Sequence, residues 1–446
     1  MKATIAALAV ALGASSALAE SISPVTVKGN AFFKGDERFY IRGVDYQPGG
    51  SSKIVDPIAD PDTCKRDIEN FKDLGLNTIR VYSIDNSKNH DECMKMLADA
   101  GIYLVLDVNT PKYSINRADP EISYNAVYLQ SIFATVQMFA KYDNTLAFFS
   151  GNEVINDGKT SEVAPWVKAT TRDIRQFIKK RNLRQVPVGY SAADIDTNRL
   201  ETAQYMNCGD DDERSDFFAF NDYSWCSPSS FETSGWDQKV KNFTDYGVPI
   251  FLSEYGCNLN KRDFSEVKAL YSTEMTGVYS GGLVYEYSQE PSDYGLVEIK
   301  GGKSSKPSKL ADFNALKSAF SKTKNPSGDG GYNKKGAASK CPARSAPNWD
   351  VDGNKKLPTL PTDAQRYMDN GAGDGPGLNG PGSQSAGSKA EGPDTSGGGS
   401  GGGSPDSTSS PGAAAGLRAP EFAVAPLMVL VTVGLSTLFG ASMIMI

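Results

Sequence analysis

Two glutamates, Glu153 and Glu254, are the side chains whose type and position best fit a catalytic pair. Each follows a strongly apolar run, at 146–151 in one case and at 248–253 in the other. Both carboxyl groups should therefore be partly desolvated, and two such groups held close together cannot easily both be ionised. A protonated carboxyl beside an ionised carboxylate is the pair of catalytic groups with which glycosidases break a glycosidic bond. The two residues predict a carbohydrate-active site, provided that the fold brings them together.

The composition excludes or disfavours several other centres. With one histidine, His90, a multi-histidine metal site cannot be built, and a Ser-His-Asp or Cys-His site has a single candidate base. No two cysteines have the C-x2-C spacing of a zinc site. The 46 basic and 53 acidic side chains include no basic run, which argues against nucleic acid as a partner. We expect no metal and no cofactor, and we expect His90 on the surface.

Eight short β-rich runs alternate with helical patterns and must position the two glutamates. Apolar runs buried on both faces and separated by helices indicate parallel strands, and eight such units indicate a closed (β/α)8 barrel, the TIM barrel of the α/β class. An open doubly wound sheet is the alternative, but no G-x-G-x-x-G follows the first strand. The expected strands are 39–43, 77–82, 102–108, 146–151, 186–190, 217–221, 248–253 and 282–287, and the helical patterns include 63–74, 91–100, 124–141, 162–180 and 264–276.

The chemistry of such a barrel lies where its strands end and the following loops begin. In this chain the strand ends carry two glutamates and many tyrosines, but no histidine. Neutral sugars need flat amphipathic faces and partners for their hydroxyls, and tyrosine supplies both. The candidate sugar platforms are Tyr82, Tyr223, Tyr285 and Tyr294, and the other strand-end side chains include Asp45, Arg80, Asp107, Asn152 and Asn221.

Both ends of the chain have the patterns of targeting segments. Residues 1–19 combine Lys2, an apolar run and a small-residue cleavage site, as in a secretory signal peptide. Residues 422–446 are uncharged, and small residues precede them by a short spacer, which is the pattern of a glycolipid (GPI) anchor signal. A retained membrane helix is the alternative. The expected attachment residue is Ser410, with Ser409 and Gly412 as alternatives.

Gly, Ser and Pro dominate residues 371–420. Such a segment cannot bury enough apolar surface to offset its ordering entropy, so we expect a disordered tether, with order fading from about residue 325. The expected domains are a signal peptide at 1–19, a catalytic barrel at 20–325, an extension followed by a flexible linker at 326–410, and an anchor signal at 411–446 that is removed. The six cysteines should form three disulfides whose pairing the spacing leaves open, and Asn242 lies in a glycosylation sequon.

Four motifs together indicate a resemblance to a known family: GVDYQP at 43–48, RVY at 80–82, GNE at 151–153 and SEYGC at 253–257. They resemble the fungal glycolipid-anchored β-1,3-glucanosyltransferases, glycoside hydrolase family 72, over about residues 25 to 341. Some members of that family add a cysteine-rich carbohydrate-binding domain after the barrel. No cysteine follows Cys341 here, so the chain resembles the short form of the family.

The resemblance implies a retaining transglycosylase in which Glu153 is the acid/base and Glu254 is the nucleophile. It implies that Asn152 bonds the sugar 2-hydroxyl, that Arg80 orients Glu254, and that the four tyrosines line a glucan groove. It also implies that Cys341 pins the start of the tether to the barrel. The implied disulfides are Cys64–Cys93, Cys208–Cys341 and Cys226–Cys257.

The expected function is elongation of cell-wall glucan at the outer face of the plasma membrane. A monomer held by a lipid anchor, or moved into the wall, would cleave a β-1,3-glucan internally and transfer the new reducing end to the non-reducing end of another chain. One alternative is a retaining β-1,3-glucanase, in which water takes the place of the acceptor. The other is an inactive, anchored glucan-binding wall protein.

Overall fold

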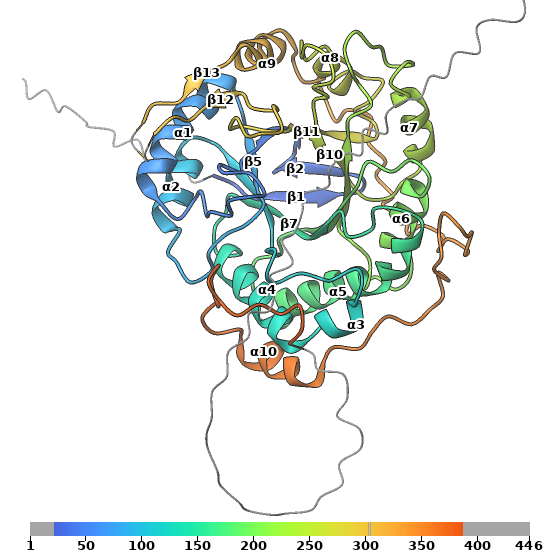
Figure 1. Ribbon diagram of the computed structural model, residues 1–446. Coiled ribbons are helices and arrows are strands. Elements are labelled where there is room, and N and C mark those ends of the chain that lie inside the picture. The colour runs from blue at the N-terminus through green and yellow to red at the C-terminus, as the bar shows by residue number, and fades with distance from the viewer. Residues whose placement is uncertain (1–21, 302, 304, 387–446) are drawn as a thin grey trace, which may run out of the picture. The chain divides into compact units, whose positions relative to one another are not determined.

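Eight parallel strands close into a barrel in the computed structural model, which describes residues 22–301, 303 and 305–386 (Figure 1). Each barrel strand is followed along the chain by at least one helix, so the predicted (β/α)8 barrel is confirmed. The strands are β4 (Ile41–Asp45), β5 (Thr78–Val81), β6 (Tyr103–Asp107), β7 (Thr145–Asn152), β8 (Val188–Ala192), β9 (Phe217–Asp222), β10 (Ile250–Tyr255) and β11 (Tyr279–Val284).

Short sequence signals start and stop the outer helices. α1 (Pro61–Leu74) follows Asp60, whose side chain accepts the amide of Thr63 at 2.9 Å, and it ends at Gly75 in the left-handed conformation. α4 (Ala126–Phe139) follows Asn125, which caps the helix in the same way. The remaining helices are α2 (Asp91–Asp99), α3 (Pro120–Ser123), η1 (Lys159–Val163), α5 (Ala164–Lys180), α6 (Arg199–Met206), α7 (Trp236–Phe243), α8 (Glu266–Leu270), α9 (Ala311–Lys322), η2 (Thr362–Ala364) and α10 (Gln365–Asn370).

The boundaries differ from the expected ones at a few places. All eight expected runs become barrel strands, but β11 ends at Val284, so Tyr285 and Tyr287 lie in the loop that follows it. The pattern at 264–276 yields only the short helix α8. The structure also contains a small two-stranded pair, β12 (Val297–Glu298) and β13 (Ser308–Lys309), between β11 and α9.

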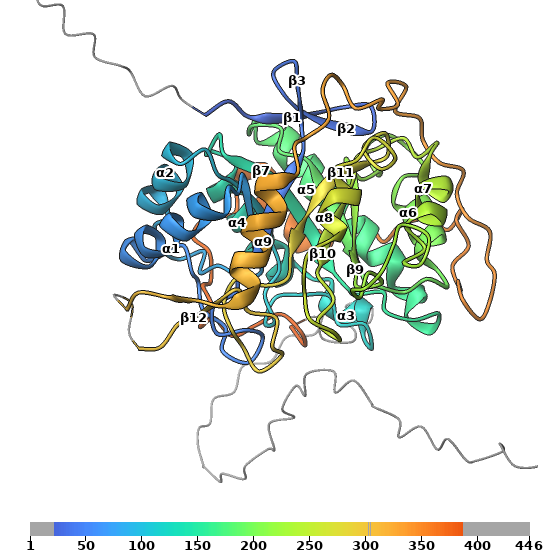
Figure 2. The same ribbon diagram turned by 90° about the horizontal axis from the view of Figure 1, so that it is seen from above.

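A three-stranded antiparallel sheet, which the sequence analysis missed, closes the N-terminal end of the barrel (Figure 2). Its Phe32 ring lies 6.2 Å from that of Phe217 and 5.9 Å from that of Phe251, so it fills the barrel where the strands begin. The opposite end, where the strands finish, is left for the functional loops. The strands of this sheet are β1 (Val25–Lys28), β2 (Ala31–Lys34) and β3 (Glu37–Phe39).

The segment 326–386 packs along the barrel, so the expectation that order fades from about residue 325 is wrong for these residues. Trp349 is fully buried, and its ring lies 5.4 Å from that of Tyr205. Farther on, the amide of Gly377 donates to Asn86 at 2.8 Å, and Asn125 donates to the carbonyl of Ser383 at 2.8 Å. The barrel supplies the apolar surface and hydrogen-bond partners that the composition of this segment lacks. Its path is seen in orange and red in Figure 1.

His90 lies in the interior rather than on the surface, which corrects the sequence-based expectation. Its side chain is 1% exposed, with Nε2 2.7 Å from a carboxylate oxygen of Asp56 and the ring 4.9 Å from that of Phe139. Both partners are distant in sequence, so the local pattern around His90 carried no sign of them.

The three disulfides of the structure are Cys64–Cys93, Cys208–Cys341 and Cys226–Cys257, the pairs that the resemblance implies. Asn242 is exposed on α7. The signal peptide, the anchor signal and the attachment residues Ser409, Ser410 and Gly412 lie outside the described residues. Within the described part of the chain, no helix has the length and apolarity needed to span a membrane.

Loss of the Cys208–Cys341 bridge should loosen the C-terminal segment. Replacing both cysteines by serine should lower the free energy of unfolding by about 2–5 kcal/mol, because the bridge closes a long loop in the unfolded chain. Limited proteolysis should then cut within 326–386 before it cuts the barrel. The matched control replaces Cys64 and Cys93 by serine, which should leave that segment protected. Equal protection in both variants would contradict this role of the bridge.

Candidate active site

Glu153 follows the last residue of β7 and adopts a left-handed backbone conformation, with φ 51°. This conformation is costly for a residue other than glycine, so the surroundings must hold it. Its amide donates to the carbonyl of Ser191 at 2.9 Å, and its carbonyl accepts from Arg117 at 2.9 Å. Its carboxylate accepts from the Asn221 amide at 2.7 Å. The half-buried Glu153 carboxyl is thus turned toward β9.

Glu254 lies within β10 and is 8% exposed. One carboxylate oxygen accepts from the Tyr82 hydroxyl at 2.8 Å and from Arg80 Nη1 at 3.2 Å. The other oxygen accepts from the Tyr223 hydroxyl at 2.7 Å. Three donors from two strand ends, those of β5 and β9, therefore fix this carboxylate and favour its ionised form.

A short chain of hydrogen bonds joins the two glutamates. Asn221, which donates to Glu153, accepts from the hydroxyl of Ser253 at 2.8 Å, and Ser253 directly precedes Glu254. The hydroxyl of Ser191 lies 2.8 Å from that of Ser253 and 2.7 Å from Asn152 Oδ1. The two carboxyl groups are therefore set by one connected network at the C-terminal end of the barrel.

Arg80 is the fully buried cation at the centre of the site. Its Nε and Nη2 donate to Asp107 at 2.8 and 3.2 Å, and Nη1 reaches Glu254. Two more buried acids lie in this region, Asp45 at 3.9 Å from Arg80 and Glu286 after β11. Burial raises the pKa of Asp45 well above its usual range and raises that of Glu286 to about 8. Of these acids, Asp107 and Glu254 are the ones that accept hydrogen bonds from Arg80.

The proton affinity of Glu254 results from opposing influences. Burial raises the pKa of its carboxyl, and the nearby charge of Glu153 adds to that rise. Arg80 and the hydroxyls of Tyr223 and Tyr82 lower it again by stabilising the carboxylate. The net pKa lies above the usual value, so ionised Glu254 is lost as the pH falls through this raised pKa.

The four expected tyrosines gather at the same rim. Neighbouring rings in the set have centroids 5.2 to 6.4 Å apart. Tyr82 and Tyr223 are bonded to Glu254 and extend from it toward the other two rings. The structure therefore brings together every residue that the sequence analysis gave a catalytic or substrate-binding role: Arg80, Tyr82, Asn152, Glu153, Tyr223, Glu254, Tyr285 and Tyr294.

Several residues that contribute to the site were missed by the sequence analysis or were given no role in it. Asn221 was recognised as a strand end, and its amide turns out to hold Glu153. Glu286 could have been noticed as an acid after the last barrel strand. Arg117 lies in the long loop after β6, and no local signal connects it with Glu153.

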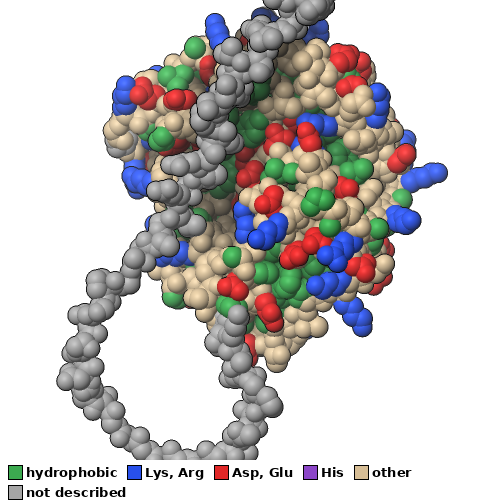
Figure 3. Space-filling model, turned by 45° about the vertical axis from the view of Figure 1, so that its right-hand side comes forward, with side chains coloured by type: hydrophobic (Ala, Val, Ile, Leu, Met, Phe, Trp, Pro, Cys, Tyr) green, Lys and Arg blue, Asp and Glu red, His purple; other side chains and the backbone are tan. Residues whose placement is uncertain are grey.

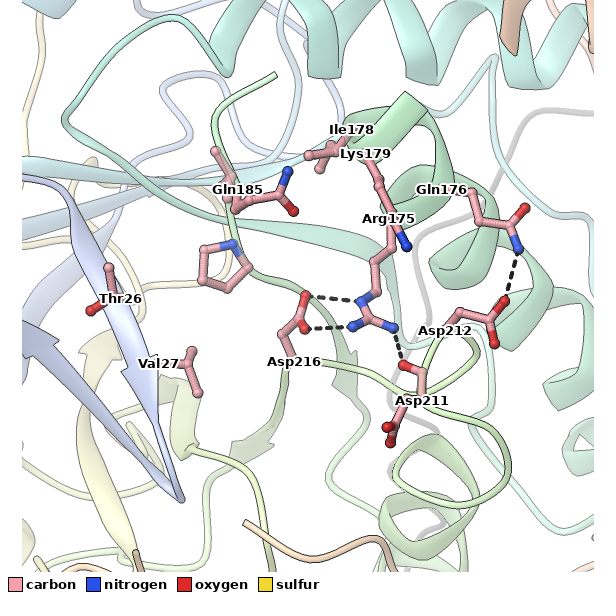
Figure 4. Close-up of a pocket in the computed structure, with 12 residues that line it drawn as sticks. Thr26, Val27, Arg175, Gln176, Ile178, Lys179, Gln185, Asp211, Asp212 and Asp216 are labelled. Carbon is pink, nitrogen blue, oxygen red and sulfur yellow. Dashed lines mark hydrogen bonds and ion pairs between the residues drawn. The ribbon is translucent and has the colours of Figure 1, made fainter. Parts of the chain in front are cut away.

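A cavity of about 470 Å³ at the other end of the barrel is not part of this site (Figure 4). It lies between β1 and the residues before β8. Its central guanidinium, Arg175, is held by Asp216 at 3.1 Å and by the carbonyl of Asp211 at 2.6 Å. This arrangement braces α5 against the start of β9.

A family model and the amino-acid sequences of known proteins all relate this chain to glucanosyltransferases. The family model described as "Glucanosyltransferase", of the glycoside hydrolase 72 type, matches residues 14–324. The 1,3-beta-glucanosyltransferase gel1 of Aspergillus fumigatus is 70% identical over the full length of both chains. The 1,3-beta-glucanosyltransferase PGA4 of Candida albicans is 56% identical and covers 78% of this chain and 77% of its own.

Solved structures agree with these relatives. A mutant of Saccharomyces cerevisiae Gas2p in complex with laminaritetraose and laminaripentaose superposes with a TM-score of 0.72 at 37% identity. The match covers 78% of this chain and 77% of that one.

The hydrogen bond from Tyr223 predicts a shift in pH dependence. Tyr223→Phe removes a donor to the Glu254 carboxylate, which should raise its pKa and move the acidic limb of kcat/KM for glycosidic-bond cleavage up by about one pH unit. The matched control is Tyr285→Phe, whose hydroxyl does not bond Glu254, and it should leave the limb in place. If the acidic limb of kcat/KM is unchanged or moves to lower pH in Tyr223→Phe, Glu254 is not the group whose titration produces that limb.

Proposed function

Because the chain belongs to the glucanosyltransferase family, we propose that it is a retaining β-1,3-glucanosyltransferase that elongates cell-wall glucan. It cleaves a β-1,3-glucan internally and transfers the new reducing end to the non-reducing end of another β-1,3-glucan. The observation that carries this proposal is the pairing of a fixed, buried Glu254 with a half-buried Glu153 in one hydrogen-bonded network.

In the first step Glu254 acts as the nucleophile. Its carboxylate attacks the anomeric carbon, the bond from that carbon to the leaving oxygen breaks, and Glu153 gives its proton to that oxygen. The product is a covalent glycosyl ester on Glu254. Arg80, Tyr82 and Tyr223 hold the attacking carboxylate in its ionised form and in a fixed orientation.

In the second step Glu153 acts as the base. It removes the proton from the 3-hydroxyl of an acceptor glucan, the acceptor oxygen attacks the anomeric carbon, and the Glu254 carboxylate is released. Asn152 supports both steps. Its Oδ1 accepts from Ser191, which leaves the amide nitrogen to donate to the sugar 2-hydroxyl.

The choice between transfer and hydrolysis depends on the position of the acceptor. A bound glucan chain competes with water through orientation, since the chemistry of the second step is the same for both. The rings of Tyr223, Tyr285 and Tyr294 form a contiguous surface on which an acceptor chain can be held beside Glu254. This surface supports transfer as the main reaction.

The protein works outside the cell, at the outer face of the plasma membrane. The signal-peptide pattern of residues 1–19 and the three disulfides support an extracellular location. The small residues around Ser410 and the apolar tail at 422–446 support attachment through a glycolipid.

Product sizing tests the proposed reaction. A reduced laminari-oligosaccharide incubated with the full chain should give products longer than the starting sugar as well as shorter ones. Products that are only shorter would identify a β-1,3-glucanase instead. Glu254→Gln should abolish both kinds of product, and Glu153→Gln should lower the rate by about 10²–10⁴-fold, as for loss of a general acid/base. Turnover that survives Glu254→Gln would contradict the mechanism.

Release from membranes tests the anchor. A phosphatidylinositol-specific lipase should release the mature protein from cell membranes into the aqueous phase, because only a lipid would hold it. The control is detergent extraction without the lipase, which should solubilise it in either case. A protein that stays with the membrane after lipase treatment would indicate a retained helix at 422–446.

A further inference from the structure

We propose that a pocket beside Glu153, walled partly by the C-terminal segment, binds a distal stretch of β-1,3-glucan. The pocket has a volume of about 850 Å³, which falls in the range of pockets that hold small ligands. This inference rests on the proposed function and extends its substrate site beyond the cleavage point. The lining residues used here are Arg117, Lys159, Trp166, Arg344, Asp350 and Lys355.

Three separate segments build the pocket: the loop after β6, the stretch from the end of β7 into α5, and residues 344–355. The last of these is firmly attached. A side chain at Gly158 would collide with the carbonyl of Pro347, so these two backbones are in close contact. Asn198 donates to the carbonyls of both Asp157 and Asn348, at 3.0 and 3.3 Å. The wall is therefore fixed before any ligand arrives.

The pocket adjoins the catalytic acid through one residue. Arg117 lines the pocket, and its Nη2 donates to the backbone carbonyl of Glu153 at 2.9 Å. A polymer that crosses the site at Glu153 can therefore extend past Arg117 toward this pocket. A small substrate that ends at the cleavage point would leave the pocket unused.

The lining chemistry fits a neutral, hydroxyl-rich chain. Four basic and four acidic side chains line the pocket, so it has no net preference for an anion or a cation. Within the pocket, Arg344 is paired with Asp350. Charges of both signs are also interspersed over the face of the molecule seen in Figure 3. The half-buried indole of Trp166 lines the pocket, with Lys355 Nζ over its ring at 5.9 Å from the centroid. The part of the ring that Lys355 leaves free is a flat apolar face of the kind on which a sugar ring packs. Paired carboxylates and guanidiniums can bond sugar hydroxyls without requiring a charged ligand.

Chain-length dependence of binding tests the pocket. In the full chain carrying Glu254→Gln, which should bind without turnover, affinities for laminaribiose and laminariheptaose are measured by calorimetry. Adding Trp166→Ala should weaken laminariheptaose binding about tenfold and leave laminaribiose binding unchanged. Lys355→Ala, which removes an exposed side chain from the same pocket, should weaken only the longer sugar, by a smaller factor.

Tyr367→Ala is the matched control, because this half-buried aromatic lies on the same C-terminal segment but does not line the pocket. It should change neither affinity. The inference is overturned if both pocket variants bind laminariheptaose like their parent, or if each loses affinity for both sugars equally. The proposed function is tested separately, since it fails only if the unmodified chain makes no lengthened products.

Discussion

The buried charge of Arg80 is the constraint on which the rest of the site depends. A guanidinium cannot give up its proton in a protein, so burying it requires carboxylate partners within hydrogen-bond reach. Asp107 and Glu254 supply them, from β6 and β10 on different sides of the barrel. The charge of Arg80 thereby lowers the pKa of Glu254, which burial raises. The burial of Arg80 and the proton affinity of the proposed nucleophile depend on the same ion pairs.

The barrel was predictable because its strands have a strong local signature. Runs such as those of β6 and β7 are buried on both faces, and near-continuous apolar stretches of this kind are typical of parallel strands. The position of Glu153 and Glu254 at strand ends then placed them on one rim. The hydroxyls of Tyr82 and Tyr223 could be placed near that rim, but their bonds to Glu254 depend on side-chain packing across the barrel, which sequence spacing does not specify.

The errors have a common physical cause. The predictions for His90 and for the segment 326–386 rest on the local sequence alone. In neither case does the local sequence supply enough apolar surface to indicate burial. Both obtain partners from distant parts of the chain: Asp56 and Phe139 for His90, and Tyr205 for the buried Trp349. Composition is a reliable guide to order only when a segment must form its own core. Composition does not predict order when a segment can pack on the surface of a folded barrel. Here the Cys208–Cys341 disulfide also joins the segment to the barrel.

The two glutamates are held differently, and the difference suits the two roles that we propose for them. A nucleophile must remain ionised and aligned, and Glu254 is nearly buried with three donors on its carboxylate. An acid/base must give up and recover a proton in each cycle, which three fixed donors would oppose by stabilising only the ionised form. Glu153 has a single described donor on its carboxylate, from Asn221, and its orientation is set instead through its backbone by Ser191 and Arg117. Fixing the main chain while leaving the carboxyl oxygens available keeps the geometry without locking the protonation state.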